Sequence, residues 1–413
     1  MVVKIVEFTE VKLNLTSGLT NFKLVIMKKY IKFILLILLV SCIDKVDLIS
    51  STNNRTLIID AVITTEIKKH QITLSYSYDF DADEPTYAKN ASVGLTDENG
   101  NSFSFQQINE KGVYEATIPF KAEENIAYTL VVNTEEGKTY TSKPEETSGT
   151  STIDKISVRT GTDNLDNDGV YFTVETQDSD DAKYFKYDYV ETFRIVAPYW
   201  TNERLIVESI QPFEYRKELG TDAAKVCYVS NSSKDIIIHD IVSSNNTKVN
   251  FDFLFYKKNN YKINERHSIL LKQRVQSFDA YNYYKALKKI SSSDDVFSGV
   301  QPGNISNNII PSDPNDNVIG YFEVSHVSTK RFFFNYTDLY NDMEVNYIED
   351  CQLLNPPLSG ELLAPSPLLL SLQAGNLYYA DGANAAVPFT LVTEGCGDCR
   401  KYGNTEKPNF WID

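Results

Sequence analysis

Short runs of alternating apolar and polar residues, at the spacing of β-hairpins, dominate the chain from residue 55 to about residue 145. Leu57 to Thr64 and Gln71 to Tyr78 have the composition of strands, and Asn99-Gly100 separates two further strand-like runs. An Asn-Gly pair between alternating segments is the strongest short-range signal of a hairpin. More such runs follow at 112–114, 127–132 and 138–141. About seven strands in roughly ninety residues predict an immunoglobulin-like β-sandwich over residues 55–145.

A polar, Ser/Thr-rich segment at 144–152 interrupts this pattern and predicts a domain boundary. Beyond it, runs rich in Tyr, Phe, Val and Ile lie at 170–176, 184–195, 236–241, 249–256, 268–274 and 318–327. These residue types fit a pleated, half-buried surface. We therefore predict a mainly β protein in which a larger β-rich domain, residues 153–413, follows the sandwich.

One amphipathic helix is predicted at about residues 277–290. Ser277 is a suitable N-cap, Asp279 lies in the first turn, and Lys288 and Lys289 lie in the last. An apolar stripe at helical spacing contains Phe278, Tyr281, Tyr284 and Leu287. Such a stripe more often packs against a core than forms a platform for a ligand, so we expect it to be part of a core.

The segment from Met27 to Cys42 has the pattern of a bacterial lipoprotein signal. Lysines at 28, 29 and 32 precede the apolar run 33–40, and Leu39-Val40-Ser41-Cys42 has the form of a lipobox. About ten apolar residues are too few for a transmembrane helix, which needs roughly 20. We expect a cleaved signal peptide at 27–41, lipidation of Cys42, a tether at 42–54, and attachment to a membrane through the lipid anchor.

Residues 1–26 precede this signal and contain no targeting pattern. We therefore expect them to be a spurious upstream extension, with the true start at Met27. An unusually long segment before the apolar run is the alternative.

The net charge of -16, from 40 Lys and Arg against 56 Asp and Glu, excludes nucleic acid as an expected partner. Phosphate recognition needs clustered basic residues. An acidic surface is instead the usual state of a soluble exported protein.

Four cysteines remain beyond Cys42, at Cys227, Cys351, Cys396 and Cys399. An even number in an oxidising compartment predicts disulfides. Cys396-Gly-Asp-Cys399 could otherwise be half of a zinc site or a redox pair, but no second CxxC accompanies it. Four cysteines allow three pairings, and the sequence does not choose among them.

Oxygen-bearing residues at Asn164, Asp166, Asp168 and Glu175, with Gly169 among them, have the spacing of a calcium loop. These are weak candidates for two reasons. Asn164 replaces the Asp that usually begins such a loop, and residues 170–175 have the pattern of a strand, which would hold Glu175 away from the loop. We interpret the segment as an acidic turn before a strand, and the acidic cluster at 79–84 in the same way. No metal site is predicted.

No short catalytic or nucleotide-binding motif is present, so we expect no cofactor and no enzymatic activity. Glycosidase carboxylates leave no short signature, which keeps a surface glycan hydrolase as an alternative.

Several features occur together in a specific order. They are Cys42-Ile43-Asp44, the Asn99-Gly100 hairpin with Gly112-Val-Tyr114, Gly137-Lys-Thr-Tyr140-Thr-Ser142, the 278–290 helix followed by Gly303-Asn304-Ile305 and Ile319-Gly320-Tyr321-Phe322, and Cys396-x-x-Cys399-Arg400 with Lys407-Pro408-x-Phe410-Trp411. Over nearly the whole mature chain, this order resembles the Bacteroidota lipoproteins of domain-of-unknown-function family 4249. The family resemblance leads us to expect a Gly-Gly pair after the cysteines, but this chain has Tyr402-Gly403-Asn404 there. The difference concerns only the local turn.

The resemblance implies an outer-membrane lipoprotein encoded beside a TonB-dependent receptor, with no catalytic residues to carry over. We therefore expect a lipid-anchored protein of the outer membrane, facing the periplasm or the cell surface. Its expected role is that of a non-enzymatic binding or accessory component of a TonB-dependent nutrient-uptake system, with an unknown ligand. A structural envelope or adhesion protein is a further alternative to the glycan hydrolase.

Overall fold

The computed structural model describes residues 55–77, 85–177, 179, 181–242, 247–291, 307–341, 347–357, 366–375, 377–380 and 389–413. The chain divides into two compact units, Met1–Asn53 and Asn54–Asp413, and all described residues belong to the second. This unit is mainly β, as the sequence predicts. The lipobox with Cys42, the acidic cluster at 79–84 and Gly303-Asn304-Ile305 lie outside the described residues.

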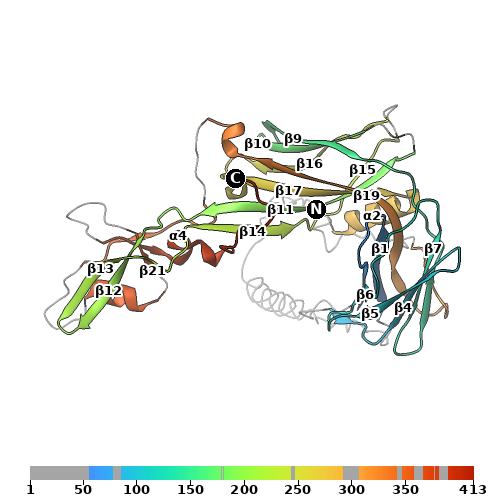
Figure 1. Ribbon diagram of the computed structural model, residues 1–413, viewed down its shortest axis with the longest axis horizontal. Coiled ribbons are helices and arrows are strands. Elements are labelled where there is room, and N and C mark those ends of the chain that lie inside the picture. Colours follow the sequence, from blue (N-terminus) through green and yellow to red (C-terminus); the bar gives the residue numbers. More distant parts are fainter. Residues whose placement is uncertain are drawn as a thin grey trace, which may run out of the picture. The chain divides into compact units, whose positions relative to one another are not determined.

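Within the described residues, the largest sheet has fourteen strands, and Figure 1 shows its course through the fold. Twelve of them follow one path, in the order β14 (Val226–Ser232), β11 (Tyr184–Val196), β17 (His267–Gln276), β19 (Val318–Phe334), β1 (Leu57–Thr64), β2 (Gln71–Tyr76), β6 (Val113–Ala116), β5 (Ser102–Gln107), β4 (Ser92–Asp97), β7 (Tyr128–Asn133), β8 (Thr139–Ser142) and β18 (Ile309–Pro311). Off this path, β15 (Ile237–Asp240) pairs with β11, and β3 (Thr86–Tyr87) pairs with β2.

The β4–β5 hairpin turns at the predicted Asn99-Gly100 pair. Gly100 has a φ of 85°, a left-handed conformation that glycine adopts without steric penalty. The carboxylate of Asp97 accepts hydrogen bonds from the backbone N–H groups of Asn99 and Asn101 at 3.0 and 2.8 Å. These bonds satisfy the backbone of the turn and confirm the hairpin.

The strands from β1 to β8 curl around one hydrophobic core, in a sandwich-like arrangement. Alternation along β1 directs Leu57, Ile59, Ala61 and Ile63 into this core. Residues far along the chain complete it, because Ile309 of β18 and Phe322 and Val324 of β19 are buried in the same cluster. The segment 55–145 therefore shares its core with strands from beyond the predicted boundary at 144–152.

Strand β19 belongs to two parts of the fold at once. Its first half pairs with β1 in parallel, from Leu57 opposite Val318 to Thr64 opposite Ser325. Its second half pairs with β17 in antiparallel fashion, from Val275 opposite His326 to His267 opposite Phe334. This strand thus joins the curled N-terminal strands to β17 and β11 in a continuous sheet.

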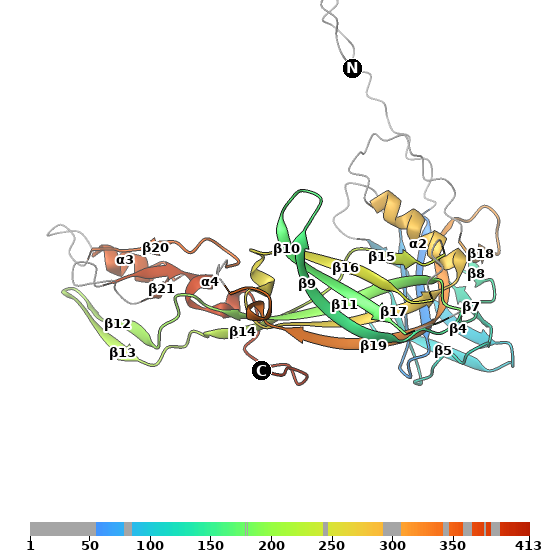
Figure 2. The same cartoon turned by 90° about the horizontal axis from the view of Figure 1, so that it is seen from above.

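A three-stranded sheet forms a second layer over β11, β17 and β19 (Figures 1 and 2). Its order is β16 (Asn250–Lys257), β10 (Asp168–Thr176) and β9 (Ile153–Thr162). A second core lies between the layers and includes Phe172 and Val174 of β10 with Phe185, Tyr187 and Leu271 of the large sheet. Side chains alternate along β11 and β17, so every second residue of these strands points away from the second core.

Helix α2 (Phe278–Ser291) confirms the predicted helix, and the Ser277 hydroxyl accepts a hydrogen bond from the Ala280 N–H at 3.1 Å. Its buried residues are Ala280, Tyr281 and Tyr283. The predicted stripe is wrong at Phe278, which is 58% exposed, because the sheet meets a face of the helix rotated toward Tyr283.

Two smaller sheets and the remaining helices form the C-terminal part. The sheets are the β12 (Glu203–Ile210) and β13 (Phe213–Leu219) hairpin, and β20 (Leu353–Leu354), β22 (Leu391–Thr393) and β21 (Leu377–Tyr379). The helices are α3 (Pro367–Gln373) and α4 (Glu394–Gly397), with 3-10 turns η1 (Tyr261–Ile263), η2 (Tyr336–Asp338) and η3 (Cys399–Lys401). The Cys351–Cys396 disulfide lies within this part, and Cys227–Cys399 joins it to β14 of the large sheet.

A buried histidine makes the stability of the first core depend on pH. His70 is fully buried, and its Nε2 lies 3.1 Å from the Phe120 carbonyl oxygen. Burial, assisted by the nearby Lys68 cation, lowers the His70 pKa from 6.5 to about 4. The unfolded chain therefore binds a proton below pH 6.5 that the folded protein excludes until about pH 4.

We expect the free energy of unfolding that His70 contributes to be complete above pH 6.5 and to fall by roughly 3 kcal/mol as the pH approaches 4. The change His70→Gln should remove this part of the pH dependence. Urea denaturation of both proteins between pH 7 and pH 4 measures it. If the free energy of unfolding falls equally with pH in both proteins, groups other than His70 cause the pH dependence.

Candidate functional site

Charged side chains line one face of the large sheet, opposite the second core. In β11, Phe185, Tyr187 and Tyr189 face that core, so Lys186 and Asp188 point the other way. In β17, Leu271 and Val275 face the core, and Lys272 and Arg274 point away from it. The strict two-residue period of strands therefore creates a polar face on strands that are otherwise apolar.

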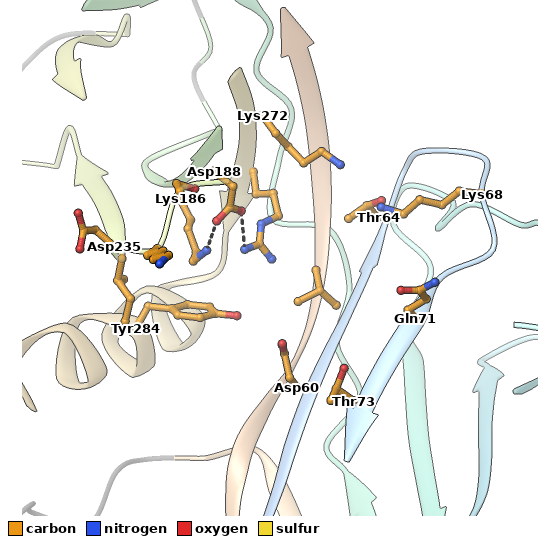
Figure 3. A pocket seen from close by; sticks show the side chains of 15 residues that line it. Asp60, Thr64, Lys68, Gln71, Thr73, Lys186, Asp188, Asp235, Lys272 and Tyr284 are labelled. Atoms are coloured by element: carbon orange, nitrogen blue, oxygen red, sulfur yellow. Dashed lines mark hydrogen bonds and ion pairs between the residues drawn. The ribbon is translucent and has the colours of Figure 1, made fainter. Parts of the chain in front are cut away.

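The register between β11 and β17 brings these four side chains together. Lys186 lies directly opposite Arg274, and Asp188 directly opposite Lys272. The Asp188 carboxylate accepts hydrogen bonds from Lys186 Nζ at 2.7 Å and from Arg274 Nη2 at 3.0 Å. Asp188 thus holds two cations side by side (Figure 3).

A second carboxylate lies behind this group. Glu323 of β19 is 2% exposed and accepts from Arg274 Nη1 at 3.3 Å. The Ser325 hydroxyl donates to the same oxygen as Arg274, and the other oxygen accepts from Gln276 at 3.1 Å. Arg274 is therefore anchored on both sides, while its Nε has no hydrogen-bond partner among the described residues.

The opposite wall comes from β1, β2 and the turn between them. Asp60, Val62 and Thr64 of β1 and Gln71 and Thr73 of β2 line it. Lys68, in the turn, and Lys272 both donate to the Glu66 carboxylate, at 2.8 and 2.9 Å. The Glu66 carboxylate thus joins Lys68 of this wall to Lys272 of β17.

Tyr284 of α2 closes one side of the space. Lys186 Nζ lies 5.1 Å and Arg274 Cζ 5.9 Å from the centre of its ring. The side chain reaches from the helix toward β1 and Asp60 (Figure 3). The segment 233–236 between β14 and β15 completes the lining, held by a hydrogen bond from the Ser233 N–H to the Tyr189 carbonyl at 2.8 Å.

These walls enclose a cavity of about 430 Å³, within the size range of small-molecule sites. Five cations line it, namely Lys68, Lys186, Lys234, Lys272 and Arg274, against three carboxylates, Asp60, Asp188 and Asp235. Glu66 and Glu323 contact these cations from outside the lining and bring the carboxylates to five, so cations outnumber carboxylates only where Glu66 alone pairs with Lys68 and Lys272.

The surroundings shift the pKa values of two cavity carboxylates, Asp60 and Asp188, in opposite directions. Burial raises the pKa of Asp60, and the nearby Arg274 and Lys186 cations only partly oppose this. Burial would also raise the pKa of Asp188, but Arg274 and Lys186 contact it directly and lower its pKa overall. Burial, followed by the Arg274 charge, lowers the pKa of Lys186. The cavity thus holds an ionised Asp188 beside a carboxyl that is easier to protonate.

The family model for the domain of unknown function DUF4249 matches residues 43–331. This chain belongs to the DUF4249 family. The match includes every residue that lines the cavity, whereas Cys351, Cys396 and Cys399 lie beyond its end.

The comparison with curated proteins found no match. Among solved structures, the DUF4249 chain matches a DUF4785 family protein from Legionella pneumophila at 11% identity and a TM-score of 0.16. The match covers 52% of this chain and 50% of the other, so the chain spans about half the length of that protein.

The four weak calcium candidates of the DUF4249 chain do not come together. Asp168 and Glu175 lie at opposite ends of β10, opposite Thr162 and Lys155 of β9. The turn is closed by Asp163, whose carboxylate accepts from the Leu165 and Asn167 N–H groups at 2.8 and 2.9 Å. This is the acidic turn before a strand, and Asn164 and Asp166 belong to it. Within the described ranges, no group of three or more His, Cys, Asp or Glu could hold a metal ion.

The disulfide prediction for the four cysteines agrees with the structure, which also supplies the pairing. Cys227 joins Cys399 and Cys351 joins Cys396, so the two cysteines of the CxxC motif do not pair with each other. Cys42 lies outside the described residues. In the part of the chain that the structure describes, no helix has the length and apolar character needed to cross a membrane.

Sequence reasoning did not find the cavity residues of this DUF4249 protein. The available signal was a charged residue at every second position within an apolar strand, as at Lys186 and Asp188 and again at Lys272 and Arg274. Alternation of this kind identifies one face of each strand. It does not identify the strand that lies beside it, and the site depends on that neighbour.

Proposed function

We propose that this DUF4249 protein is an outer-membrane lipoprotein that binds a small polar solute as a non-enzymatic component of a TonB-dependent nutrient-uptake system. The observation that carries the binding role is the cavity of about 430 Å³ lined by paired charges. The sequence Leu39-Val40-Ser41-Cys42 supports the lipid anchor, and the family resemblance supports the receptor partner.

Paired charges suit a binding role. Asp188 with Lys186 and Arg274, and Glu66 with Lys68 and Lys272, hold each other in place before a ligand enters. Side chains that are already oriented lose little conformational entropy on binding. A purely structural envelope or adhesion role gains no support from such a cavity.

The partner proposal predicts that the intact protein, solubilised from membranes in mild detergent, copurifies with a TonB-dependent receptor. A Cys42→Ala variant should be released from the membrane or remain uncleaved, and it should lose the receptor because it no longer lies in the same bilayer. Mass spectrometry of the purified complexes, with fatty-acid labelling of both proteins, measures this. A labelled wild type without any receptor would contradict the partnership, and an unlabelled wild type would contradict the anchor.

The opposite pKa shifts of Asp60 and Asp188 favour one second candidate, a surface glycan hydrolase. Glycoside hydrolysis uses a carboxyl with a raised pKa near a carboxylate that stays ionised, and the pKa of Asp60 is raised whereas that of Asp188 is lowered. Hydrolysis of polysaccharides by the wild type, with loss of activity in both Asp60→Asn and Asp188→Asn, would favour this candidate over a binding role.

A further inference from the structure

We propose that the ligand of this cavity is a small organic anion that carries hydroxyl groups, of the chemical class of sugar acids. The proposal rests on the binding role proposed above and specifies the ligand. It assigns the acidic group of the ligand to Lys68, Lys272 and Arg274, and the hydroxyl groups to the polar side chains of β1 and β2.

The distribution of charge favours an anion. Asp188 and Glu323 together balance Lys186 and Arg274, but a single carboxylate, Glu66, serves both Lys68 of the β1–β2 turn and Lys272 of β17. The group of Lys68, Lys272 and Glu66 therefore carries one positive charge in excess. Burial raises the pKa of Asp60, which lines the same cavity, so its carboxyl takes up a proton more readily than a free Asp. Low-dielectric walls strengthen the attraction between such a charge and a ligand.

The hydrogen-bonding groups also favour an anion. A lysine ammonium has three N–H donors, and Lys68 and Lys272 each use one on Glu66 within the described residues. Arg274 is 8% exposed, and its Nε–H has no described partner. A buried donor without a partner is unfavourable, and an acidic oxygen of a ligand, or a water that the ligand orders, would satisfy it.

The remaining lining favours hydroxyl groups over an inorganic ion. Thr64, Gln71 and Thr73 present hydroxyl and amide groups along the β1 and β2 wall, with Asp60 beside them (Figure 3). These groups both donate and accept hydrogen bonds, as a polyhydroxylated ligand requires. A volume of about 430 Å³ is also far larger than the space that a single phosphate or sulfate ion fills.

Isothermal titration calorimetry of the full-length protein in detergent tests the proposal. The probes are glucuronate, galacturonate and gluconate, with neutral glucose and inorganic phosphate as comparisons. We expect at least one of the three hydroxy acids to bind at least tenfold more tightly than glucose and phosphate. If glucose binds as tightly as the hydroxy acids, the assignment of an anionic ligand is overturned. If phosphate binds as tightly as they do, the assignment of hydroxyl groups is overturned. Absence of binding by all three hydroxy acids would overturn the whole assignment.

Matched variants locate the site. Lys272→Gln and Lys68→Gln should each weaken binding of the acid by about tenfold, because each removes one charge-assisted contact. Lys155→Gln makes the same change at an exposed position on β9, outside the cavity, and should leave binding unchanged. Equal affinity in all three variants would place the binding elsewhere. Receptor copurification is a separate readout, so failure of the ligand class is distinguishable from failure of the uptake role.

Discussion

Replacing Cys227 and Cys399 together by alanine is expected to lower the free energy of unfolding by up to about 5 kcal/mol. The disulfide closes a loop with a sequence separation of 172 residues, and the entropy lost from the unfolded chain increases with loop length. The bond lies in a buried cluster with Phe193 and Ile195 of β11 and with Ala197, which directly follows that strand. It therefore holds the C-terminal part, including η3, against β14.

The matched control is the second disulfide. Replacing Cys351 and Cys396 opens a loop with a sequence separation of 45 residues. This change is expected to lower the free energy of unfolding by up to about 4 kcal/mol. This loop lies inside the larger one, so the two effects should not add fully. Chemical denaturation under oxidising conditions measures both variants, and mass spectrometry of a non-reduced digest checks the pairing. A Cys396–Cys399 peptide, or a Cys227/Cys399 variant as stable as the wild type, would contradict the expected pattern.

The change Arg274→Met is expected to destabilise the protein by about 3–5 kcal/mol, because it leaves the Glu323 carboxylate buried without its cation. Asp188 keeps Lys186 at 2.7 Å, so most of the effect should come from Glu323. Met has a similar length to the arginine stem and fills the space beside Tyr284. Thermal unfolding and urea denaturation at pH 7 measure the change.

A double variant separates charge from packing. In Arg274→Met combined with Glu323→Gln, no buried carboxylate remains unpaired, and Gln can still bond to Gln276 and Ser325. We expect this protein to regain most of the lost stability. If it is no more stable than Arg274→Met alone, packing of the guanidinium against Tyr284, and not the charge of Glu323, accounts for the loss.

Local patterns in the sequence were sufficient for many elements. The predicted strand at Leu57 to Thr64 has the bounds of β1, the Asn99-Gly100 pair forms a hairpin, and Ser277 caps α2. Each of these features depends on residues within a few positions of one another, where periodicity, turn conformation and capping act directly. The oxidised state of the four later cysteines also followed from their number and the expected compartment.

Other features required contacts between distant residues. The parallel pairing of β1 with β19 joins Leu57 to Val318, and no local pattern indicates which strand lies beside β1. The same holds for the exposed Phe278, because the tertiary contacts of α2 decide which part of its apolar stripe meets the sheet.

By itself, the sequence determined the mainly β class, the Asn99-Gly100 hairpin, the helix α2 and the alternation that places Lys186 and Asp188 on one face of a strand. Only the tertiary structure decided that this face meets Arg274, Lys272 and Asp60 in one cavity, and which cysteines pair. The physical reason is that alternation along a strand sets the direction of each side chain, whereas the register between strands sets its neighbours. That register is selected by the burial of two whole cores, to which residues hundreds of positions apart contribute together.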